Sequence, residues 1–181
     1  MAQRLLKNLP SKTAAIVVMG VSGAGKSTIG GLLAARLNRP LVEGDRLHPP
    51  ANIEKMSKGV PLDDADRLPW LQAIAARIDE ARKAGEPIVV TCSALKRSYR
   101  TILADSHDDV GFVYLHGAKD LIARRLAARI DHFMPPGLLD SQFAALQEPA
   151  EDEPSIDIAI DATPDEIVAS IVGKFAEESR S

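Results

Sequence analysis

The sequence contains, at residues 20–27, the run Gly20-Val21-Ser22-Gly23-Ala24-Gly25-Lys26-Ser27. This run matches the pattern G-x-x-x-x-G-K-[ST], and it lies between a short β-branched run, Ala14–Met19, and a helical pattern over Ser27–Leu37. The order of strand, glycine-rich loop and helix is typical of a phosphate-binding loop, because the glycines let backbone N–H groups converge on phosphate oxygens. A glycine-rich turn that matches by accident is the alternative, and its position directly after a strand argues against it. We therefore predict a nucleoside triphosphate site.

The side chains of this loop have distinct expected roles. Lys26 reaches the β- and γ-phosphates as a point charge, and the Ser27 hydroxyl is the expected ligand of Mg²⁺. The predicted cofactors are therefore ATP, as phosphoryl donor, and Mg²⁺. The predicted ATP-binding residues of the loop are Gly20, Val21, Ser22, Gly23, Ala24, Gly25, Lys26, Ser27 and Thr28.

Short apolar runs alternate with helical patterns along the rest of the chain. The predicted strands cover Ala14–Met19, Pro40–Glu43, Pro87–Thr91, Val110–Leu115 and Ile156–Ile160. The predicted helices cover Ser27–Leu37, Pro49–Lys58, Leu68–Lys83, Lys96–Ala104, Asp120–Arg129 and Leu138–Leu146, and a last helix opens at Thr163. This alternation, with no Asn-Gly hairpin between strands, indicates an α/β protein with a parallel sheet covered by helices on both faces.

Composition limits the class of protein. A length of 181 residues suits one domain over residues 1–181. The chain contains 22 Lys+Arg and 25 Asp+Glu, a net charge of −3, so it has no excess of positive charge to bind nucleic acid. Cys92 is the single cysteine, so no internal disulfide forms and a Cys/His zinc site is not expected. A reducing, cytoplasmic location fits best. The longest uncharged stretch, Thr13–Gly25, is shorter than the roughly 20 residues of a membrane span.

Asp45 is a predicted catalytic residue. It follows the second predicted strand, and the carboxyl ends of parallel strands meet at one crevice beside the loop. A carboxylate at that place can accept the proton of a substrate hydroxyl or orient a water bound to magnesium. The alternative is an aspartate that only caps a turn, because Gly44-Asp45 is also ordinary turn chemistry.

Two arginines point to a lid. Arg125 and Arg129 are four residues apart on one predicted helical face, and they lead into the helix-breaking segment 132–137. Arginines at the base of a lid can bring planar charge to the transferring phosphoryl group. An ordinary solvated helix face is the alternative for either one.

Other classes of P-loop protein lack support in the sequence. A GTPase needs N-K-x-D, which is absent, and the D-x-x-G at Asp108 precedes a strand where a switch would follow one. A motor or transporter ATPase would show an acid at the end of an apolar strand, but the third predicted strand runs into Thr91-Cys92-Ser93.

Motifs over nearly the whole chain resemble those of the small bacterial-type gluconokinases, relatives of shikimate kinase. Besides the loop, the resemblance rests on Gly44-Asp45-Arg46-Leu47-His48-Pro49, Asn52-Ile53-Glu54-Lys55-Met56 with Gly59, Pro61-Leu62-Asp63-Asp64, Asp66-Arg67-Leu68-Pro69-Trp70-Leu71, Cys92-Ser93-Ala94-Leu95-Lys96, His132-Phe133-Met134 and Ser141-Gln142-Phe143 through Gln147-Glu148-Pro149. Taken together this set is highly specific.

The resemblance implies a three-layer αβα P-loop kinase fold with a five-stranded parallel sheet and a small helical lid, at about residues 130–147. It implies transfer of the ATP γ-phosphoryl group to the 6-hydroxyl of D-gluconate, giving 6-phospho-D-gluconate and ADP, a product that feeds the pentose phosphate or Entner–Doudoroff routes. It also suggests a homodimer.

The substrate segment is expected at about residues 45–83. Gluconate is a polyol with one carboxylate, so its site should combine a cation with hydrogen-bonding groups. The expected substrate-binding residues are Asp45, His48, Lys55, Arg67, Lys96 and His132. Arg67 is the predicted carboxylate clamp. Lys96 could equally be a solvated surface residue, and a lone loop histidine such as His132 is more often polar surface than a ligand contact.

The wider fold implies roles for the two lid arginines. Arg129 would reach the phosphates as a catalytic residue beside Lys26 and Asp45, and Arg125 would flank adenine. The two roles could also be exchanged.

Three competing interpretations make different predictions. A kinase for another small metabolite would share the loop and lid but accept a different hydroxyl. A non-enzymatic ATP-gated binding module would bind ATP and transfer nothing. A purely structural protein would gain no thermal stability from ATP.

Overall fold

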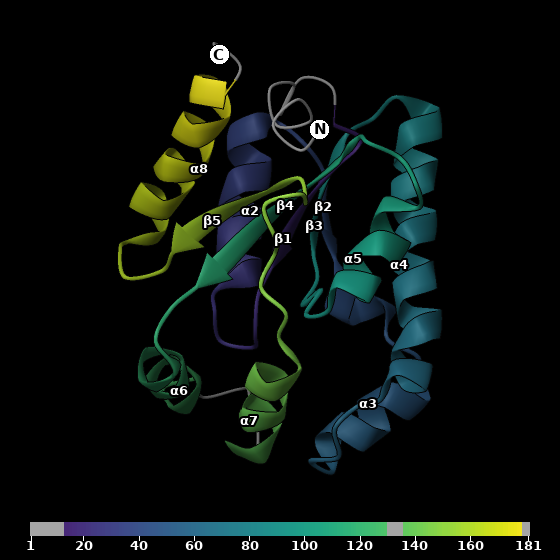
Figure 1. Ribbon diagram of the computed structural model, residues 1–181, viewed down its shortest axis with the longest axis vertical. Coiled ribbons are helices and arrows are strands. Elements are labelled where there is room, and N and C mark those ends of the chain that lie inside the picture. The colour runs from purple at the N-terminus through teal and green to yellow at the C-terminus, as the bar shows by residue number, and fades with distance from the viewer. Residues whose placement is uncertain (1–12, 130–135, 179–181) are drawn as a thin grey trace.

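A computed structural model describes residues 13–129 and 136–178 (Figure 1). At its centre is a five-stranded parallel sheet in the order β2-β3-β1-β4-β5. The strands are β1 (Ala15–Met19), β2 (Leu41–Glu43), β3 (Ile88–Thr91), β4 (Val110–His116) and β5 (Ser155–Ala159). In the central register, Ala15 of β1 lies opposite Ile88 on one side and Val110 on the other. The parallel sheet and its strand positions confirm the prediction from the sequence, with ends that differ by one residue.

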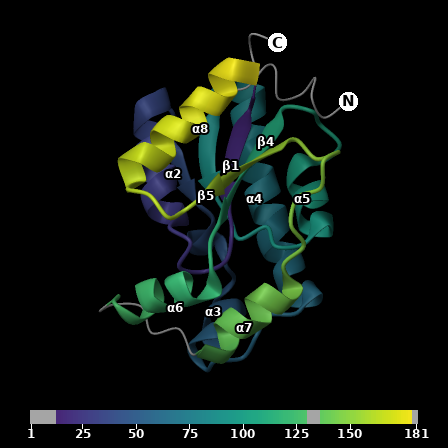
Figure 2. The ribbon, with the colours of Figure 1, turned by 60° about the vertical axis from the view of Figure 1, so that its left-hand side comes forward.

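Helices cover both faces of this sheet. They are α2 (Lys26–Leu37), α3 (Pro50–Ser57), α4 (Asp64–Ala84), α5 (Arg97–Ala104), α6 (Lys119–Ala127), α7 (Pro136–Ala145) and α8 (Pro164–Glu178), with a 3₁₀ turn η1 (Gly44–Leu47). Figures 1 and 2 show α2 and α8 together on one face and α4 and α5 on the other, and these pairs contact each other. None of the helices in the described ranges has the length and apolar character that a bilayer span requires.

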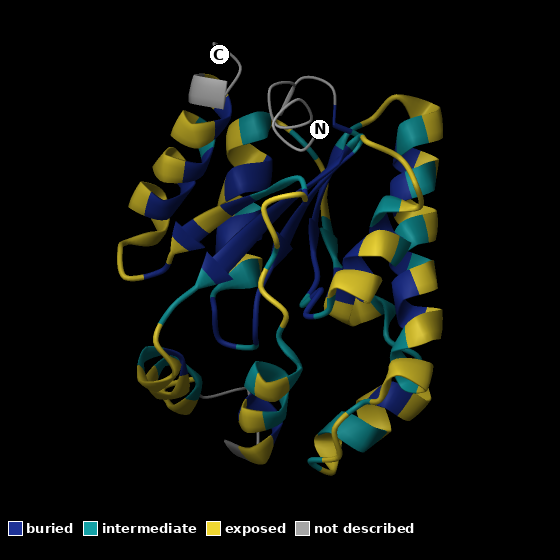
Figure 3. Cartoon of the chain, viewed as in Figure 1, coloured by how far each residue is buried: buried dark blue, intermediate teal, exposed yellow. Residues whose placement is uncertain are grey.

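The central strands are buried because both faces of the sheet are covered. Every residue of β1 and of β3 is buried, and Figure 3 shows this dark centre inside helices whose outer sides are exposed. A strand covered on both faces needs apolar side chains at successive positions, which explains the continuous run from Ala15 to Met19.

The carboxyl ends of the strands form the functional end of the fold. The helix after β1, α2, lies on one face of the sheet, whereas α5, the helix after the neighbouring β3, lies on the other. Connections that leave two adjacent strands in opposite directions open a crevice between them, and ligands of α/β proteins bind in such crevices. In Figure 1, α3, α6 and α7 lie at this same end of the sheet.

The start of α4 differs from the prediction. The helix begins at Asp64, before the predicted Leu68, because Asp63 and Asp66 form a capping box. The Asp66 N–H donates to the Asp63 carboxylate at 2.7 Å, and the Asp63 N–H donates to the Asp66 carboxylate at 3.1 Å. Apolar periodicity begins only one turn later, so it misses this turn. The earlier start places Asp64 and Arg67 on the first turn of a helix.

A buried ion pair fixes the loop that precedes β5. Arg100 of α5 donates to both oxygens of Glu153, at 2.5 and 2.9 Å, and the exposed fractions of these two residues are 2% and 8%. Burial alone would raise the pKa of Glu153, but hydrogen bonds from Arg100 and from the Ala150 N–H hold it below its usual value. Arg100 also donates to the Ala94 carbonyl at 2.9 Å, next to the segment that carries Lys96.

Arg100→Met is expected to lower the free energy of unfolding by about 3–5 kcal/mol, because it leaves the Glu153 carboxylate buried without its cation. Urea unfolding monitored by circular dichroism measures this change. The double variant Arg100→Met/Glu153→Gln should recover a large part of the loss, since it removes the charge. Arg97→Met, which breaks the exposed pair with Asp152, is the matched control and should cost less than about 1 kcal/mol. A loss below about 1 kcal/mol for Arg100→Met would contradict this account.

Candidate active site

The phosphate-binding loop joins β1 directly to α2. Gly25 caps α2 with a φ of 97°, and no side chain caps this helix, so its first N–H groups face the loop. The Lys26 ammonium group donates to the Val21 carbonyl at 3.0 Å within the loop. Burial lowers the pKa of Lys26, a shift that the charge of Asp45 opposes and that of Arg129 increases. Asp45 and Arg129 therefore both lie within electrostatic reach of Lys26. Thr28 lies exposed in the first turn of α2.

Close packing explains two of the loop glycines. A Cβ atom on Gly23 would lie 2.6 Å from the Leu126 side chain of α6, and one on Gly20 would lie 2.7 Å from the Leu115 carbonyl. Both residues have positive φ angles, 82° and 147°. The loop is thus held between the carboxyl end of β4 and α6.

Glu43 is a site residue that the sequence analysis missed. Its carboxylate accepts a hydrogen bond from the Ser27 hydroxyl at 3.0 Å and another from the Thr91 hydroxyl at 2.7 Å. Its position in the sequence could have identified it, since Glu43 is the last residue of β2, whereas Asp45 lies two residues further on in η1. An acidic residue at the carboxyl end of a strand is expected at the crevice, and Glu43 meets this condition more directly than Asp45.

Ser27 and Glu43 are suited to Mg²⁺. The ion prefers oxygen ligands and usually keeps several waters, with one or two protein ligands and the substrate phosphates completing its shell. In the described residues, no cluster of three or more His, Cys, Asp or Glu side chains could hold a metal by itself. One hydroxyl beside one carboxylate therefore fits an ion that arrives with the nucleotide.

Asp45 lies on the rigid turn η1. The Trp70 indole donates to the Gly44 carbonyl at 2.8 Å, and a Cβ atom on Gly44 would lie 2.1 Å from the Thr91 carbonyl. The turn is therefore fixed against α4 and β3. The Asp45 side chain is exposed, and its charge acts on both Lys26 and His48. It therefore lies within electrostatic reach of the phosphate loop and of the predicted substrate segment.

His48 is an uncharged hydrogen-bonding group at neutral pH. Its ring stacks on Trp70 with centroids 4.1 Å apart, and its Nδ1 lies 3.3 Å from the Asn52 amide nitrogen. Burial lowers the pKa of His48 to about 4, a shift that the charge of Arg67 increases. A neutral imidazole suits a polyol ligand, because it can accept or donate a hydrogen bond to a hydroxyl.

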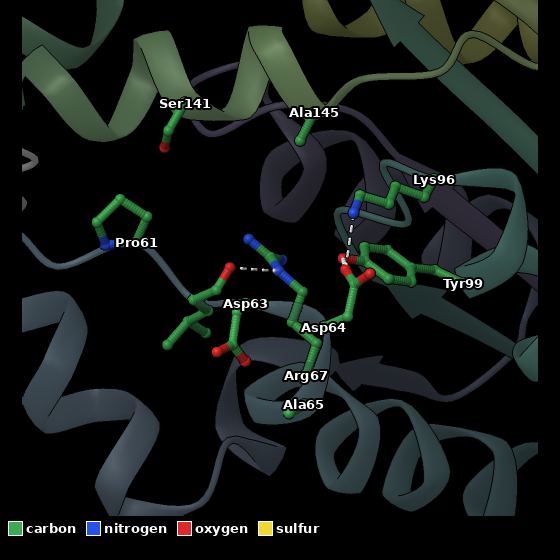
Figure 4. A pocket seen from close by; sticks show the side chains of 10 residues that line it. Pro61, Asp63, Asp64, Ala65, Arg67, Lys96, Tyr99, Ser141 and Ala145 are labelled. Carbon is green, nitrogen blue, oxygen red and sulfur yellow. Dashed lines mark hydrogen bonds and ion pairs between the residues drawn. The ribbon is translucent and has the colours of Figure 1, made fainter.

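A pocket of roughly 520 Å³ opens next to this segment, and Figure 4 shows it. It is lined by Pro61, Leu62, Asp63, Asp64, Ala65, Arg67, Lys96, Tyr99, Ser141 and Ala145, from the start of α4, the start of α5 and α7. The Arg67 side chain points into this space and donates to the Leu62 carbonyl at 3.4 Å. The volume of the pocket suits a small metabolite.

The two predicted substrate lysines take part in ion pairs. Lys96 lines the pocket and pairs with Asp64 at 2.8 Å. Lys55 lies outside the lining and pairs with Asp66 at 2.7 Å, a contact that raises the lysine pKa. The structure thus brings Arg67 and Lys96 into one pocket, whereas Lys55 lies on α3 and pairs with the N-terminal turn of α4. His132 lies outside the described residues.

Helices α6 and α7 both lie close to the phosphate loop. Arg125 of α6 donates to the Ile160 carbonyl after β5 at 2.7 Å. Arg129 follows α6, and its charge lowers the pKa of Lys26. Gln142 of α7 accepts a hydrogen bond from the Ser22 N–H at 2.7 Å, and its amide donates to the Ser22 hydroxyl at 3.0 Å. This second missed residue ties α7 to the phosphate loop.

The parallel sheet and its loop define the class of protein, a P-loop nucleotide-binding protein built like the small-molecule kinases. The family model for shikimate kinase matches residues 22–156. Cys92, which follows β3, is buried, and burial raises the pKa of its thiol to about 12, so it is no nucleophile.

More specific relatives fix the family. The chain is 48% identical to the gluconokinase of Gluconobacter oxydans, over 90% of this chain and 92% of that protein. It is 46% identical to the thermosensitive gluconokinase of Escherichia coli, over 77% and 75% of the two chains. A crystal structure of a gluconokinase from Sinorhizobium meliloti superposes with a TM-score of 0.83 at 44% identity, covering 92% and 93%. The chain belongs to the gluconokinase family of shikimate-kinase-like P-loop kinases.

Proposed function

We propose that this protein transfers the γ-phosphoryl group of ATP to the 6-hydroxyl of D-gluconate, giving 6-phospho-D-gluconate and ADP. The observation that carries the proposal is the position of Asp45, whose charge acts both on Lys26 in the phosphate loop and on His48 in the substrate segment. Membership of the gluconokinase family supports gluconate as the acceptor.

The proposed reaction is an in-line displacement. A new bond forms between the acceptor oxygen and the γ-phosphorus, the bond to the β,γ-bridging oxygen breaks, and ADP leaves. The Asp45 carboxylate takes the hydroxyl proton. Lys26 and the N–H groups at the start of α2 stabilise the charge on the phosphates.

In this proposal, Arg125 and Arg129 bind different parts of the nucleotide. The charge of Arg129 lowers the pKa of Lys26, which supports a role at the transferring phosphoryl group. Arg125 bonds to the Ile160 carbonyl, on the far side of β4, which supports a role beside the base. The segment 130–147, which includes α7, would act as the lid that excludes water.

Mg²⁺ is part of the proposal, with the Ser27 hydroxyl and the Glu43 carboxylate as its protein ligands, directly or through water. When bound, the ion neutralises charge on the β- and γ-phosphates. Glu43 also fixes the Ser27 hydroxyl, and it is itself held by Thr91.

Glu43→Gln is expected to raise the Mg²⁺ concentration for half-maximal activity by about tenfold or more, because a neutral amide binds the cation less well. A magnesium titration at fixed ATP and gluconate measures the change. Glu80→Gln, on the exposed side of α4, is the matched control and should leave the titration unchanged. An unchanged titration for Glu43→Gln would remove Glu43 from the magnesium site.

The function is tested by ADP release from Mg-ATP with gluconate, shikimate, hexoses, other sugar acids and no acceptor. Release with gluconate over a near-zero background is expected, and ³¹P–¹H correlation in the product should place the phosphate on carbon 6. Equal release with and without acceptors would indicate an ATPase. Turnover with a different acceptor alone would assign another small-metabolite kinase, and ATP binding without release would indicate a binding module.

A further inference from the structure

Arg67 has no carboxylate partner among the described residues, although one is close in sequence. Asp64 precedes it by three positions on α4, a spacing at which opposite charges normally pair on a helix. The ion pairs of the described residues include Asp64 with Lys96 but none with Arg67. The Arg67 guanidinium group instead donates to the Leu62 carbonyl at 3.4 Å and points into the pocket (Figure 4).

Two groups on the α5 side of the pocket bind the Asp64 carboxylate. The Tyr99 hydroxyl donates to the Asp64 carboxylate, and the Lys96 ammonium group donates to the same oxygen at 2.8 Å. These two hydrogen bonds lower the pKa of Asp64, so it is ionised at neutral pH. Burial and the Asp64 hydrogen bond raise the pKa of Tyr99, so its hydroxyl keeps the proton that it donates.

The Tyr99 ring also lies beneath both cations. The Arg67 guanidinium carbon is 5.7 Å from the ring centroid, and the Lys96 nitrogen is 5.6 Å from it. Both distances are within the range of cation–π attraction. Tyr99 is only 4% exposed, so its ring is a fixed platform.

Arg67 is the lining cation that takes part in no ion pair of the described residues. Lys96 pairs with Asp64, and the Asp63 carboxylate accepts from the Asp66 N–H at 2.7 Å at the start of α4. The Arg67 guanidinium group can therefore pair with a carboxylate on the acceptor.

We propose that Tyr99 is a specificity-determining positioning residue, which holds Asp64 away from Arg67 and so keeps the guanidinium group available for the carboxylate of the acceptor. This inference rests on the proposed function, in which Arg67 binds the gluconate carboxylate. Tyr99 acts through Arg67 and Asp64 and does not need to touch the acceptor itself.

Tyr99→Phe tests the inference, because it keeps the ring and removes the hydroxyl that holds Asp64. Only Lys96 then holds the Asp64 carboxylate, which can pair with Arg67 and compete with the substrate, so KM for gluconate should rise about tenfold, the effect of one lost charge-assisted interaction. The values of kcat and of KM for ATP should stay within about twofold, because the phosphate loop is untouched. Thermal unfolding checks that the variant is folded.

A second substitution separates positioning from mere packing. Asp64→Asn also frees Lys96, so the single variant Asp64→Asn is the reference for the double variant Tyr99→Phe/Asp64→Asn. The neutral amide cannot compete for Arg67, so the KM for gluconate of the double variant should lie within about twofold of that of Asp64→Asn. A merely structural role of the hydroxyl would raise KM equally in both backgrounds. Such an equal rise would overturn the inference.

The same experiment distinguishes two kinds of failure. If the wild type transfers nothing to gluconate, or if Arg67→Met leaves KM for gluconate unchanged, the proposed function or the Arg67 assignment fails. If gluconate is phosphorylated and Arg67→Met raises KM, an unchanged KM in Tyr99→Phe overturns the role of Tyr99 alone.

Discussion

Replacing Lys26 by Met is expected to lower kcat by about 10³-fold or more, because no other side chain of the loop can bring a positive charge to the phosphates. The protein should remain folded, since burial already lowers the pKa of Lys26 and its ammonium group carries a desolvation cost that Met avoids. The expected result is thus a large loss of turnover with an unchanged or higher Tm. Steady-state ADP release and thermal unfolding measure the two quantities.

Lys58→Met is the matched control for this variant. Lys58 lies at the exposed end of α3, where it pairs with Glu54, and it takes no part in the site. Its loss should leave kcat unchanged. A kcat within about tenfold of the wild type for Lys26→Met would show that the loop does not act through its lysine.

Asp45→Asn should lower kcat by roughly 10²–10⁴-fold, the range for loss of a general base. Asparagine keeps the size of the side chain and can still hydrogen-bond the acceptor hydroxyl, but it cannot take the proton. Affinity for ATP should be retained, because Asp45 lies on η1 and the loop is unchanged. Calorimetric titration with ATP in the absence of acceptor measures nucleotide binding, and ADP release with gluconate measures turnover.

Asp105→Asn serves as the control. Asp105 ends α5 in an exposed left-handed conformation with a φ of 45°, which asparagine also adopts readily, so activity should not change. Turnover of Asp45→Asn within about threefold of the wild type would assign proton transfer to another group, and Glu43 would then be the first candidate because it also lies at the end of β2.

The sheet could be predicted from the sequence because its strands are apolar at successive positions and each is followed by a helical pattern. Strand positions such as Ile88–Thr91 depend on local composition, which is fully visible in the chain. The predicted start of α4 was wrong because the true start depends on two aspartates, Asp63 and Asp66, that precede the apolar periodicity. Their spacing is visible in the sequence, but it differs from the usual capping box of Ser or Thr with Glu.

The sequence also predicts only part of the site. Lys26 and Ser27 belong to a contiguous motif, so they could be assigned from the sequence. Glu43 could have been assigned as well, because it is the last residue of a strand.

The hydrogen bonds of Gln142 with Ser22 join residues 120 positions apart, and those of Tyr99 and Lys96 with Asp64 span 35 and 32 positions. Which polar side chains meet across such distances is decided by how the helices pack on the sheet. No local pattern in the chain carries that information.

Trp70 gives this site its own optical reporter. It is the single tryptophan of the chain, it is 1% exposed, and its ring lies against His48 while its indole N–H holds the turn that carries Asp45. All indole fluorescence of the protein therefore originates next to the predicted acceptor site, so a ligand that shifts His48 or η1 alters the whole signal. Stopped-flow emission can follow acceptor binding without a label or an engineered probe.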